Sequence, residues 1–210
     1  MRHTGGTAVG LLALLATLGV AGCSDGDGEG DKGGGSVKPS KRMHAFTEAP
    51  CSLIEGKPLA GGMVFRAGTD STQSEPREDA ALDTPEAYRS TTCYRTLGTP
   101  AEGGDLWDLT TSADLYERVG PACRAKRIKE DLDRVGNREP HAIDDFTYWQ
   151  NVEEDGKVGR ELLLCDGNLL LKVTAFAPSG SQRDAVDDTL AKLVEEAAQL
   201  TEKGLREPAA

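Results

Sequence analysis

Residues 157–176 read KVGRELLLCDGNLLLKVTAF, and this stretch decides the fold of the chain. Two runs rich in aliphatic and β-branched residues, Lys157 to Cys165 and Asn168 to Phe176, flank the dipeptide Asp166-Gly167. Asp-Gly between two such runs is a strong signal for a two-residue turn of the primed type. The stretch therefore predicts a β-hairpin, and with it an antiparallel sheet.

Placing Asp166-Gly167 at the turn predicts which residues of the hairpin lie opposite one another. The predicted pairs are Leu164 with Leu169 and Leu162 with Leu171 on one face, and Leu163 with Leu170 and Glu161 with Lys172 on the other. The first face is expected to meet the core, and the apolar residues of the second indicate that it is partly covered too. The Glu161–Lys172 pair adds a favourable cross-strand charge contact.

Further strands are predicted on both sides of the hairpin along the chain. Residues 145–152 alternate between two faces as a half-buried strand does, and residues 153–156 (EEDG) follow as an acidic turn. Residues 90–97, which include Cys93, are β-prone. Residues 106–116 fit a strand better than a helix, because Thr and Trp are frequent and helix signals are few.

The N-terminal part of the domain gives weaker signals. Ala49 to Gly56 is predicted as a short helical turn, with proline early and glycine at its end. Met63 to Phe65 is predicted as a short strand. Thr69 to Pro85 is polar and is predicted as a long loop.

Two longer helices are predicted. The clearer one begins at Ser181, which forms a capping-box-like start with Asp184, and ends at Lys203-Gly204. Its apolar residues recur at helical spacing and form one stripe: Val186, Leu190, Leu193, Val194, Ala197 and Leu200. The second helix spans residues 121–135, between a Gly-Pro and a Gly-Asn pair.

These elements predict an α+β fold. An antiparallel sheet carries the C-terminal amphipathic helix, with a second helix packed on it. Residues 43–204 are long enough for one domain with a real core, and too short to indicate two.

The charge balance excludes two classes of partner. The chain has 24 basic and 35 acidic residues, a net charge of −11, and residues 1–22 carry only Arg2, so the remainder stands at −12. Such a body is repelled by nucleic acid and by anionic lipid headgroups. We therefore exclude nucleic-acid binding and electrostatic adhesion to a membrane.

A flexible tether is predicted ahead of the domain. Residues 24–40 read SDGDGEGDKGGGSVKPS, are rich in glycine and have no apolar periodicity. Such a segment cannot bury enough surface to offset the entropy lost on ordering. Residues 23–42 are therefore expected to form a flexible coil that reaches about 25 Å.

The start of the chain has the form of a secretory leader. Residues 1–7 carry one positive charge, and residues 8–20 are an apolar or small run that is too short to span a bilayer, which needs about 18–20 apolar residues. The run ends in Leu18-Gly19-Val20-Ala21-Gly22-Cys23, which resembles the lipobox of bacterial lipoprotein precursors. The alternatives are a secretory signal that is cleaved without lipidation, and a leader that is not cleaved and acts as an anchor.

The lipobox resemblance implies a cellular location and a covalent lipid anchor. Residues 1–22 would be removed as a signal peptide, and Cys23 would become the lipidated N-terminus, carrying fatty chains of the palmitate type. Two acyl chains are sufficient for stable anchoring. The expected location is the cell membrane, with the domain on its extracytoplasmic face.

Four cysteines remain once Cys23 is set aside. An even number in an oxidising compartment predicts two disulfides. A four-thiolate metal site is the alternative, but the chain has no Cys-x-x-Cys pair. Three connectivities are possible, of which we favour Cys51–Cys93 and Cys123–Cys165; each closes a loop of about 43 residues and contributes about 4 kcal/mol in the chain-entropy model.

The sequence contains no recognisable catalytic set. It lacks a nucleophile elbow, a His-Glu-x-x-His motif, a phosphate loop and a dinucleotide fingerprint, so no catalytic residue, cofactor or metal is predicted. His44, at the end of the tether, is expected to be exposed to solvent. His141 precedes Asp144 and Asp145, and a histidine–carboxylate pair there is the basis of a rival hypothesis, an envelope hydrolase or metal-assisted enzyme.

Four residues are candidates for contact with a ligand or partner. They are Trp107, Trp149, Tyr148 and His141. Large aromatic side chains suit binding surfaces. Aromatic residues make up only 5% of the chain, so most of them are expected in the core.

The domain resembles small actinobacterial lipoproteins of unknown function. The likeness lies in Pro50-Cys51-Ser52-Leu53 at the start of the domain, in Cys93-Tyr94 within a strand, and in a final hairpin and helix. Such proteins are similar to extracytoplasmic sensor domains. The resemblance supports the fold and the Cys51–Cys93 bridge, and implies no catalytic residues.

The function expected from these observations is a non-catalytic binding or interaction module of the cell envelope. Its partner would be an envelope protein or ligand that the sequence does not identify. An enzyme using His141 and a structural spacer without a specific ligand are the two rival hypotheses.

Overall fold

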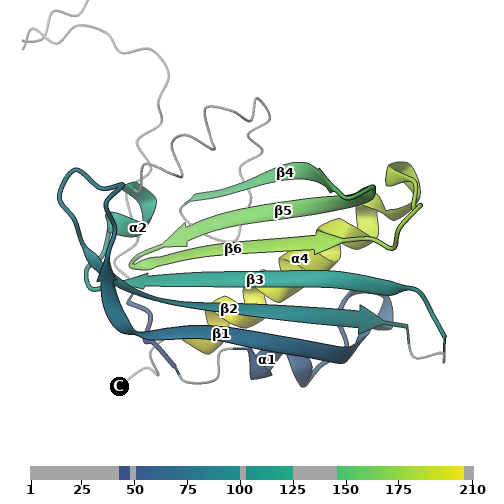
Figure 1. The fold of residues 1–210 in the computed structure, drawn as a ribbon, viewed down its shortest axis with the longest axis horizontal. Helices are drawn as coiled ribbons and strands as arrows, with labels where there is room; N and C mark the ends of the chain where they lie inside the picture. The colour runs from purple at the N-terminus through teal and green to yellow at the C-terminus, as the bar shows by residue number, and fades with distance from the viewer. Residues whose placement is uncertain (1–42, 48–50, 100–102, 125–145, 206–210) are drawn as a thin grey trace, which may run out of the picture. The chain divides into compact units, whose positions relative to one another are not determined.

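The computed structural model describes residues 43–47, 51–99, 103–124 and 146–205. The chain separates into two units, residues 1–35 and residues 36–210, and every described residue belongs to the second. In that unit a six-stranded antiparallel sheet carries a long C-terminal helix on one face (Figure 1). The predicted α+β fold is therefore confirmed.

The sheet contains two meanders joined side by side. The strands are β1 (Val64–Glu78), β2 (Ala87–Gly98), β3 (Leu106–Tyr116), β4 (Phe146–Glu154), β5 (Lys157–Asp166) and β6 (Leu169–Phe176). Their order is β1-β2-β3-β6-β5-β4, so each meander has one strand at an edge of the sheet and contributes one central strand. The central pair is β3 with β6, whose register runs from Asp108 opposite Phe176 to Leu115 opposite Leu169.

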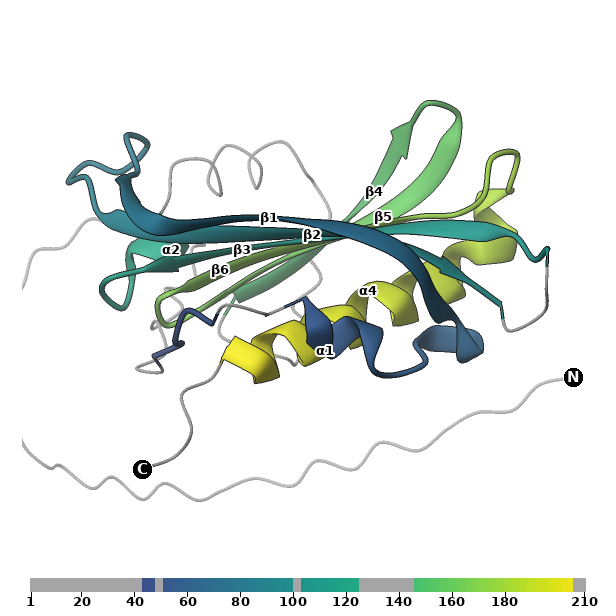
Figure 2. The same cartoon turned by 60° about the horizontal axis from the view of Figure 1, so that its bottom comes forward.

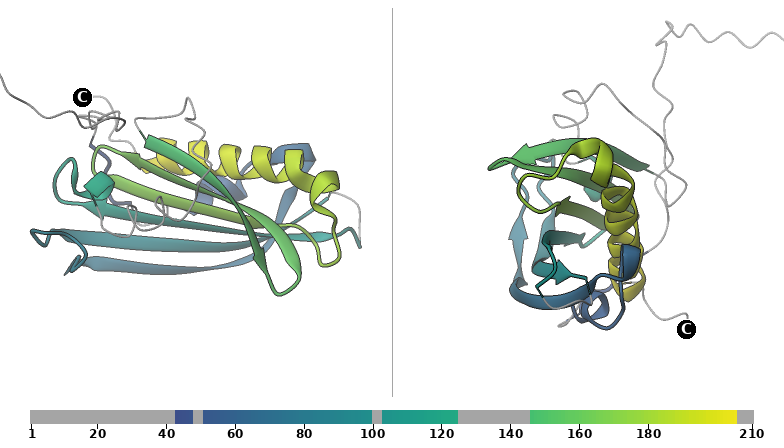
Figure 3. Two further views of the ribbon diagram at one scale, coloured as in Figure 1. Left: turned by 90° about the horizontal axis from the view of Figure 1, so that it is seen from above. Right: turned by 90° about the vertical axis from the view of Figure 1, so that its right-hand side faces the viewer.

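The C-terminal helix α4 (Arg183–Leu205) forms the main core with the sheet. It lies along one face of the strands, on the same side as α1 (Ser52–Glu55), as Figure 2 and Figure 3 show. The central part of the predicted stripe is fully buried, and Val186 and Leu200 are half-buried at its ends. The sheet supplies the aliphatic residues of the matching face: Leu162, Leu164, Leu169, Leu171 and Val173. Each Å² of apolar surface removed from water contributes about 25 cal/mol to stability. The contact between α4 and the sheet is therefore the principal stabilising contact of the domain.

Among the described residues, no helix is both long enough and apolar enough to cross a membrane.

A smaller apolar cluster covers one end of the opposite face. Ala122 of α2 (Pro121–Arg124) packs there with Leu163, Leu170 and Tyr116. The prediction that the second face of the hairpin is partly covered is thus confirmed. The rest of the helix predicted over residues 121–135 lies outside the described residues.

The predicted loop over Thr69 to Pro85 is wrong for most of its length. Residues 64–78 form β1, which pairs with β2 through eleven residue pairs. Its side chains are nearly all exposed, so no alternation between apolar and polar residues marks it. Backbone hydrogen bonds define such an edge strand, assisted by the contact of 2.9 Å between the hydroxyls of Thr72 and Thr91.

The hairpin turn lies one residue further along the chain than predicted. Asp166 pairs with Leu169, so Gly167 and Asn168 are the two turn residues, and Gly167 has φ of 60°. Glycine with positive φ in the first central position is the pattern of a type II′ turn. The shift moves each cross-strand pairing by two positions, so Leu164 faces Leu171 and not Leu169. Side chains keep their predicted faces, because the period of a strand is two residues.

Both favoured disulfides are present. Cys51–Cys93 ties the start of α1 to β2, and Cys123–Cys165 ties α2 to β5. Each bridge therefore attaches a four-residue helix to the sheet. Helices of that length are unstable alone, because nucleation is costly.

Candidate functional site: a hollow on the open face of the sheet

The face of the sheet opposite α4, here called the open face, carries a hollow of about 740 Å³. Strand alternation assigns it to this face: Leu163, Leu170 and Thr174 line it, while their chain neighbours Leu162, Leu171 and Val173 lie in the core. The hollow reaches from β3 across β6 and β5 to the end of β4, with further lining residues from β1, from β2 and from the loop between them. Its volume is in the range of natural ligand sites, about 300–1,000 Å³.

Two tyrosines from β2 and β3, here called the aromatic wall, line the hollow. Tyr88 and Tyr116 are directly opposite in the register of β2 and β3, and their rings stack with centroids 5.2 Å apart. The Arg77 guanidinium lies 4.4 Å from the centroid of the Tyr88 ring. The Tyr116 hydroxyl donates a hydrogen bond of 2.5 Å to Asp79 Oδ2. The faces of these rings are therefore largely used within the protein, and polar groups surround them.

The environment of this wall keeps both phenols neutral. Burial raises the pKa of Tyr116 far above its ordinary value, and the hydrogen bond to the Asp79 carboxylate acts in the same direction. Burial also raises the pKa of Tyr88, followed by the charge of Asp114. The tyrosines therefore offer hydroxyl groups, not phenolates, over the ordinary pH range.

A buried carboxylate lines the hollow. Glu161 on β5 is 5% exposed and accepts hydrogen bonds from Gln150 Nε2 at 2.6 Å and Thr174 Oγ1 at 3.0 Å. Lys172 Nζ lies 2.8 Å from Glu161 Oε2, so the predicted charge pair is present although Thr174 is the strand partner of Glu161. This network fixes the Lys172 ammonium and reduces the positive charge available to a ligand.

The described lining is acidic. It includes five carboxylates, Asp79, Asp114, Glu153, Glu154 and Glu161, and two cationic side chains, Arg77 and Lys172. Glu153 and Glu154, which were predicted in an acidic turn, are the last two residues of β4, and both are exposed. The lining thus carries an excess of negative charge, with hydroxyl groups of Thr110, Ser112 and Thr174 between the acidic ends.

The predicted binding residues lie elsewhere or outside the described residues. Trp149 is 7% exposed and packs in the core beneath α4, and Trp107 packs against the same core. Tyr148 is on β4, and nothing is described of its side chain; His141, with Asp144 and Asp145, lies outside the described residues. A binding role for these residues stays a prediction. Sequence reasoning missed Tyr88 and Tyr116, which matching β2 against β3 as one hairpin would have placed side by side.

The prediction that His44 is exposed is wrong. The residue is 4% exposed, and its Nε2 lies 2.9 Å from Asp166 Oδ2. Its main-chain N–H donates to Asn168 Oδ1 at 2.7 Å. The residues in these contacts are more than 120 positions apart in the chain. The sequence next to His44 therefore could not predict its burial.

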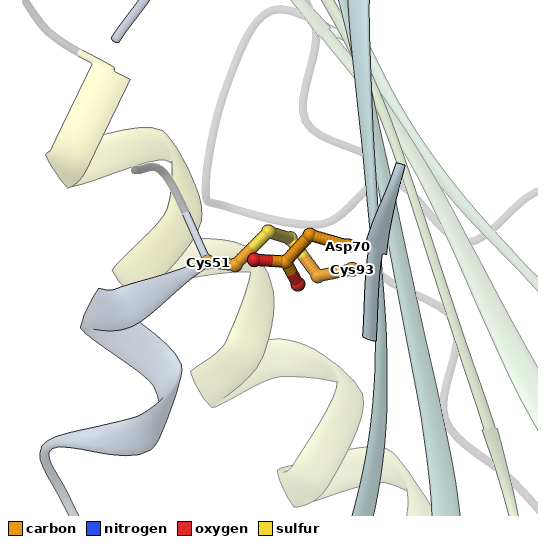
Figure 4. Close-up of side chains that lie close together, drawn as sticks. All are labelled: Cys51, Asp70 and Cys93. Carbon is orange, nitrogen blue, oxygen red and sulfur yellow. A yellow bond between two sulfur atoms is a disulfide. The ribbon is translucent and has the colours of Figure 1, made fainter. Parts of the chain in front are cut away.

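One cluster of potential metal ligands is explained by a disulfide. Cys51, Asp70 and Cys93 lie together, as Figure 4 shows, but the two sulfurs are bonded to each other and supply no thiolate. The Asp70 carboxylate is 2.6 Å from Arg95 Nη1. Arg95 is almost fully buried and also pairs with Glu55 at 2.6 Å, so this cluster connects α1, β1 and β2.

Comparison with known proteins gives no family for the chain. No family model matches it. No curated protein matches it either. Among solved structures, it is similar to the extracellular domain of PknH from Mycobacterium tuberculosis, with 10% sequence identity, a TM-score of 0.33, and coverage of 74% of this chain and 93% of that one.

The two disulfides bear on the compartment. Paired cysteines persist in oxidising surroundings and are rare where thiols are kept reduced. The described domain is therefore of the kind that works outside the cytoplasm. Cys23, the predicted site of lipidation, lies outside the described residues.

Proposed function

We propose that this chain is a lipid-anchored extracytoplasmic binding module, and that its hollow holds a positively charged peptide segment of an envelope partner. The acidic lining of the hollow carries the proposal. Five carboxylates face two cations there, and one of those cations is paired with Glu161. A basic segment is the occupant whose charge complements this surface.

The shape and polarity of the hollow favour a peptide over a small apolar molecule. Pockets for drug-sized ligands are enclosed and mostly apolar, with few polar groups. Here hydroxyl and carboxylate groups extend across several strands of an open sheet face. Because the Tyr88 ring is covered by Arg77 and Tyr116, stacking of a sugar ring on that wall is disfavoured.

The predicted anchor and tether support the same function. A module held by acyl chains on Cys23 and separated from the bilayer by a glycine-rich coil can turn towards partners in the envelope. Its excess of acidic residues keeps the module away from anionic headgroups. The tether therefore supplies reach, and the hollow supplies selectivity.

The test is peptide binding to the mature chain with Cys23→Ser, which removes only the lipid acceptor. A fluorescent Lys-Gly repeat peptide and a Glu-Gly repeat peptide of equal length are titrated at about 0.15 M salt. We expect binding of the cationic peptide alone. The double variant Glu153→Gln and Glu154→Gln should weaken it about five- to thirtyfold, since each of the two lost charge contacts contributes roughly 0.5–1 kcal/mol.

A matched control separates site binding from general attraction to an acidic protein. Asp184→Asn with Asp188→Asn removes the same charge from exposed positions on α4, against the other face of the sheet. This pair should leave the affinity almost unchanged. Equal weakening by both pairs, or no binding of the cationic peptide, would refute the proposed site.

A further inference from the structure

Three ionisable side chains are buried close together in the domain. His44, Asp166 and Glu202 are 4%, 0% and 2% exposed, and the structure brings one potential ligand atom from each within 4.8 Å of the others. They come from the start of the described chain, the end of β5 and the last turns of α4. We call this group the buried trio. It lies outside the hollow, and the proposed function does not use it.

The main chain holds the imidazole in position independently of its ring contacts. Asn168 accepts a hydrogen bond from His44 N at 2.7 Å and donates one to His44 O at 3.1 Å. Ala45 N donates to Leu205 O at 2.7 Å, which fastens the same segment to the end of α4. The trio is therefore preorganised by three elements that meet at one point.

The donor chemistry of the trio is that of a metal site. One imidazole nitrogen and two carboxylates suit Zn²⁺ and neighbouring divalent transition metals. With a neutral imidazole the three groups carry two negative charges, which a divalent ion matches. The distance of 2.9 Å between His44 Nε2 and Asp166 Oδ2 suits two ligands of one ion. Bonds of about 2.0–2.1 Å place neighbouring ligands roughly 2.9–3.4 Å apart.

The imidazole has a further nitrogen available. Among the described residues, His44 Nδ1 is buried and has no hydrogen-bond partner. Buried polar atoms are nearly always satisfied. Because Nε2 is the nitrogen that faces Asp166, Nδ1 is the ring position that keeps the proton when Nε2 binds an ion.

We propose that His44, Asp166 and Glu202 bind one divalent transition-metal ion, with Zn²⁺ as the ion of choice. The ion is structural, because all three ligands are buried. It fastens the beginning of the domain to the β5–β6 hairpin and to α4.

The experiment uses the untagged mature chain carrying Cys23→Ser, freed of metal by a chelator. Titration with Zn²⁺ should give one equivalent bound. At about a hundredfold excess over Kd, the Tm should rise by roughly 5–10 °C. Glu202→Gln keeps the shape of the side chain and should weaken binding at least about tenfold. His141→Gln, which alters a histidine outside the trio, should bind Zn²⁺ as the unaltered chain does.

Two results would overturn the proposal. The first is absence of stoichiometric binding and of a Tm shift with both Zn²⁺ and Mn²⁺. The second is unchanged Zn²⁺ affinity in a folded Glu202→Gln protein, as judged by near-UV circular dichroism. If Glu202→Gln does not fold, X-ray absorption of the zinc-loaded chain decides: nitrogen and oxygen neighbours with one imidazole support the trio, and sulfur neighbours refute it.

Discussion

The side chain of Asn168 joins three separate parts of the chain. Its Oδ1 accepts from His44 N at 2.7 Å, and its Nδ2 donates to His44 O at 3.1 Å and to Tyr116 O at 2.9 Å. The residue is 3% exposed, so water cannot replace these contacts. Asn168 is thus a turn residue with a tertiary role.

Removal of this amide should destabilise the whole domain. Asn168→Ala leaves buried main-chain groups without partners, and each such group costs about 1–3 kcal/mol. We expect the free energy of unfolding to fall by about 2–4 kcal/mol, as measured by urea denaturation.

The control is Asn151→Ala, at an exposed position on β4. It should change the free energy of unfolding by less than about 0.5 kcal/mol. Equal effects of the two substitutions would contradict the role given to Asn168.

The tyrosine pair predicts loss of stability in alkali. Because the pKa of Tyr116 is raised in the folded domain, the phenol stays protonated there while the unfolded chain ionises near pH 10. The stabilising effect is fully present below about pH 10 and is lost as pH rises from there towards the folded-state pKa. Denaturant unfolding between about pH 9 and pH 11.5 measures this slope.

Tyr116→Phe provides the matched variant for that measurement. It removes the ionisable group and should flatten the fall in stability above about pH 10, although the loss of the bond to Asp79 lowers stability at neutral pH. An unchanged slope in this variant would show that other groups cause the alkaline unfolding.

At the scale of elements, the β5–β6 hairpin explains why the faces were predictable and the register was not. Several leucines occupy consecutive positions on each strand, so pairings that differ by two residues bury similar side chains. The Asp-Gly signal favoured one register. The tertiary contacts of Asn168 stabilise the register that is observed, and the local sequence does not predict these contacts.

The two short helices depend on their disulfides. Substitution of both Cys51 and Cys93 with alanine should lower the free energy of unfolding by about 4 kcal/mol, because the bridge restricts the unfolded chain.

The intact mass of the chain with both bridges should rise by the mass of about four hydrogens on full reduction, two for each bridge. No change in mass, or no loss of stability, would remove this role. Cys23→Ser retains both bridges and serves as the control.

At the scale of the whole molecule, the location that we propose for the domain depends on lipidation of Cys23. Replacement of Cys23 by serine removes the predicted acyl acceptor, and about 0.8 kcal/mol of membrane affinity is lost for each methylene no longer buried. The protein should move from the membrane fraction to the soluble fraction of fractionated cells. Retention in the membrane at the unaltered level would contradict the anchor. Ser24→Ala is the neighbouring control and should remain membrane-bound.

The sequence contained more information about the fold than about the hollow. Strands β2 to β6 and helix α4 were predictable because alternation, turn residues and an apolar stripe are local signals. The hollow depends on β3 lying beside β6, a pairing between distant segments for which no local rule exists. His44 was placed wrongly for the same reason, since its partners Asp166 and Asn168 lie more than 120 residues further along the chain.

The outer strand β1 has a consequence for domains held close together. Its irregularities near Arg66 and near Pro76, and the charges of Asp70, Glu75 and Glu78, interrupt a ladder of backbone groups that another chain could otherwise extend. Exposed edges of this kind resist the stacking that leads to fibrils. Strand β1 therefore offers a neighbouring domain little opportunity to continue the sheet at this edge.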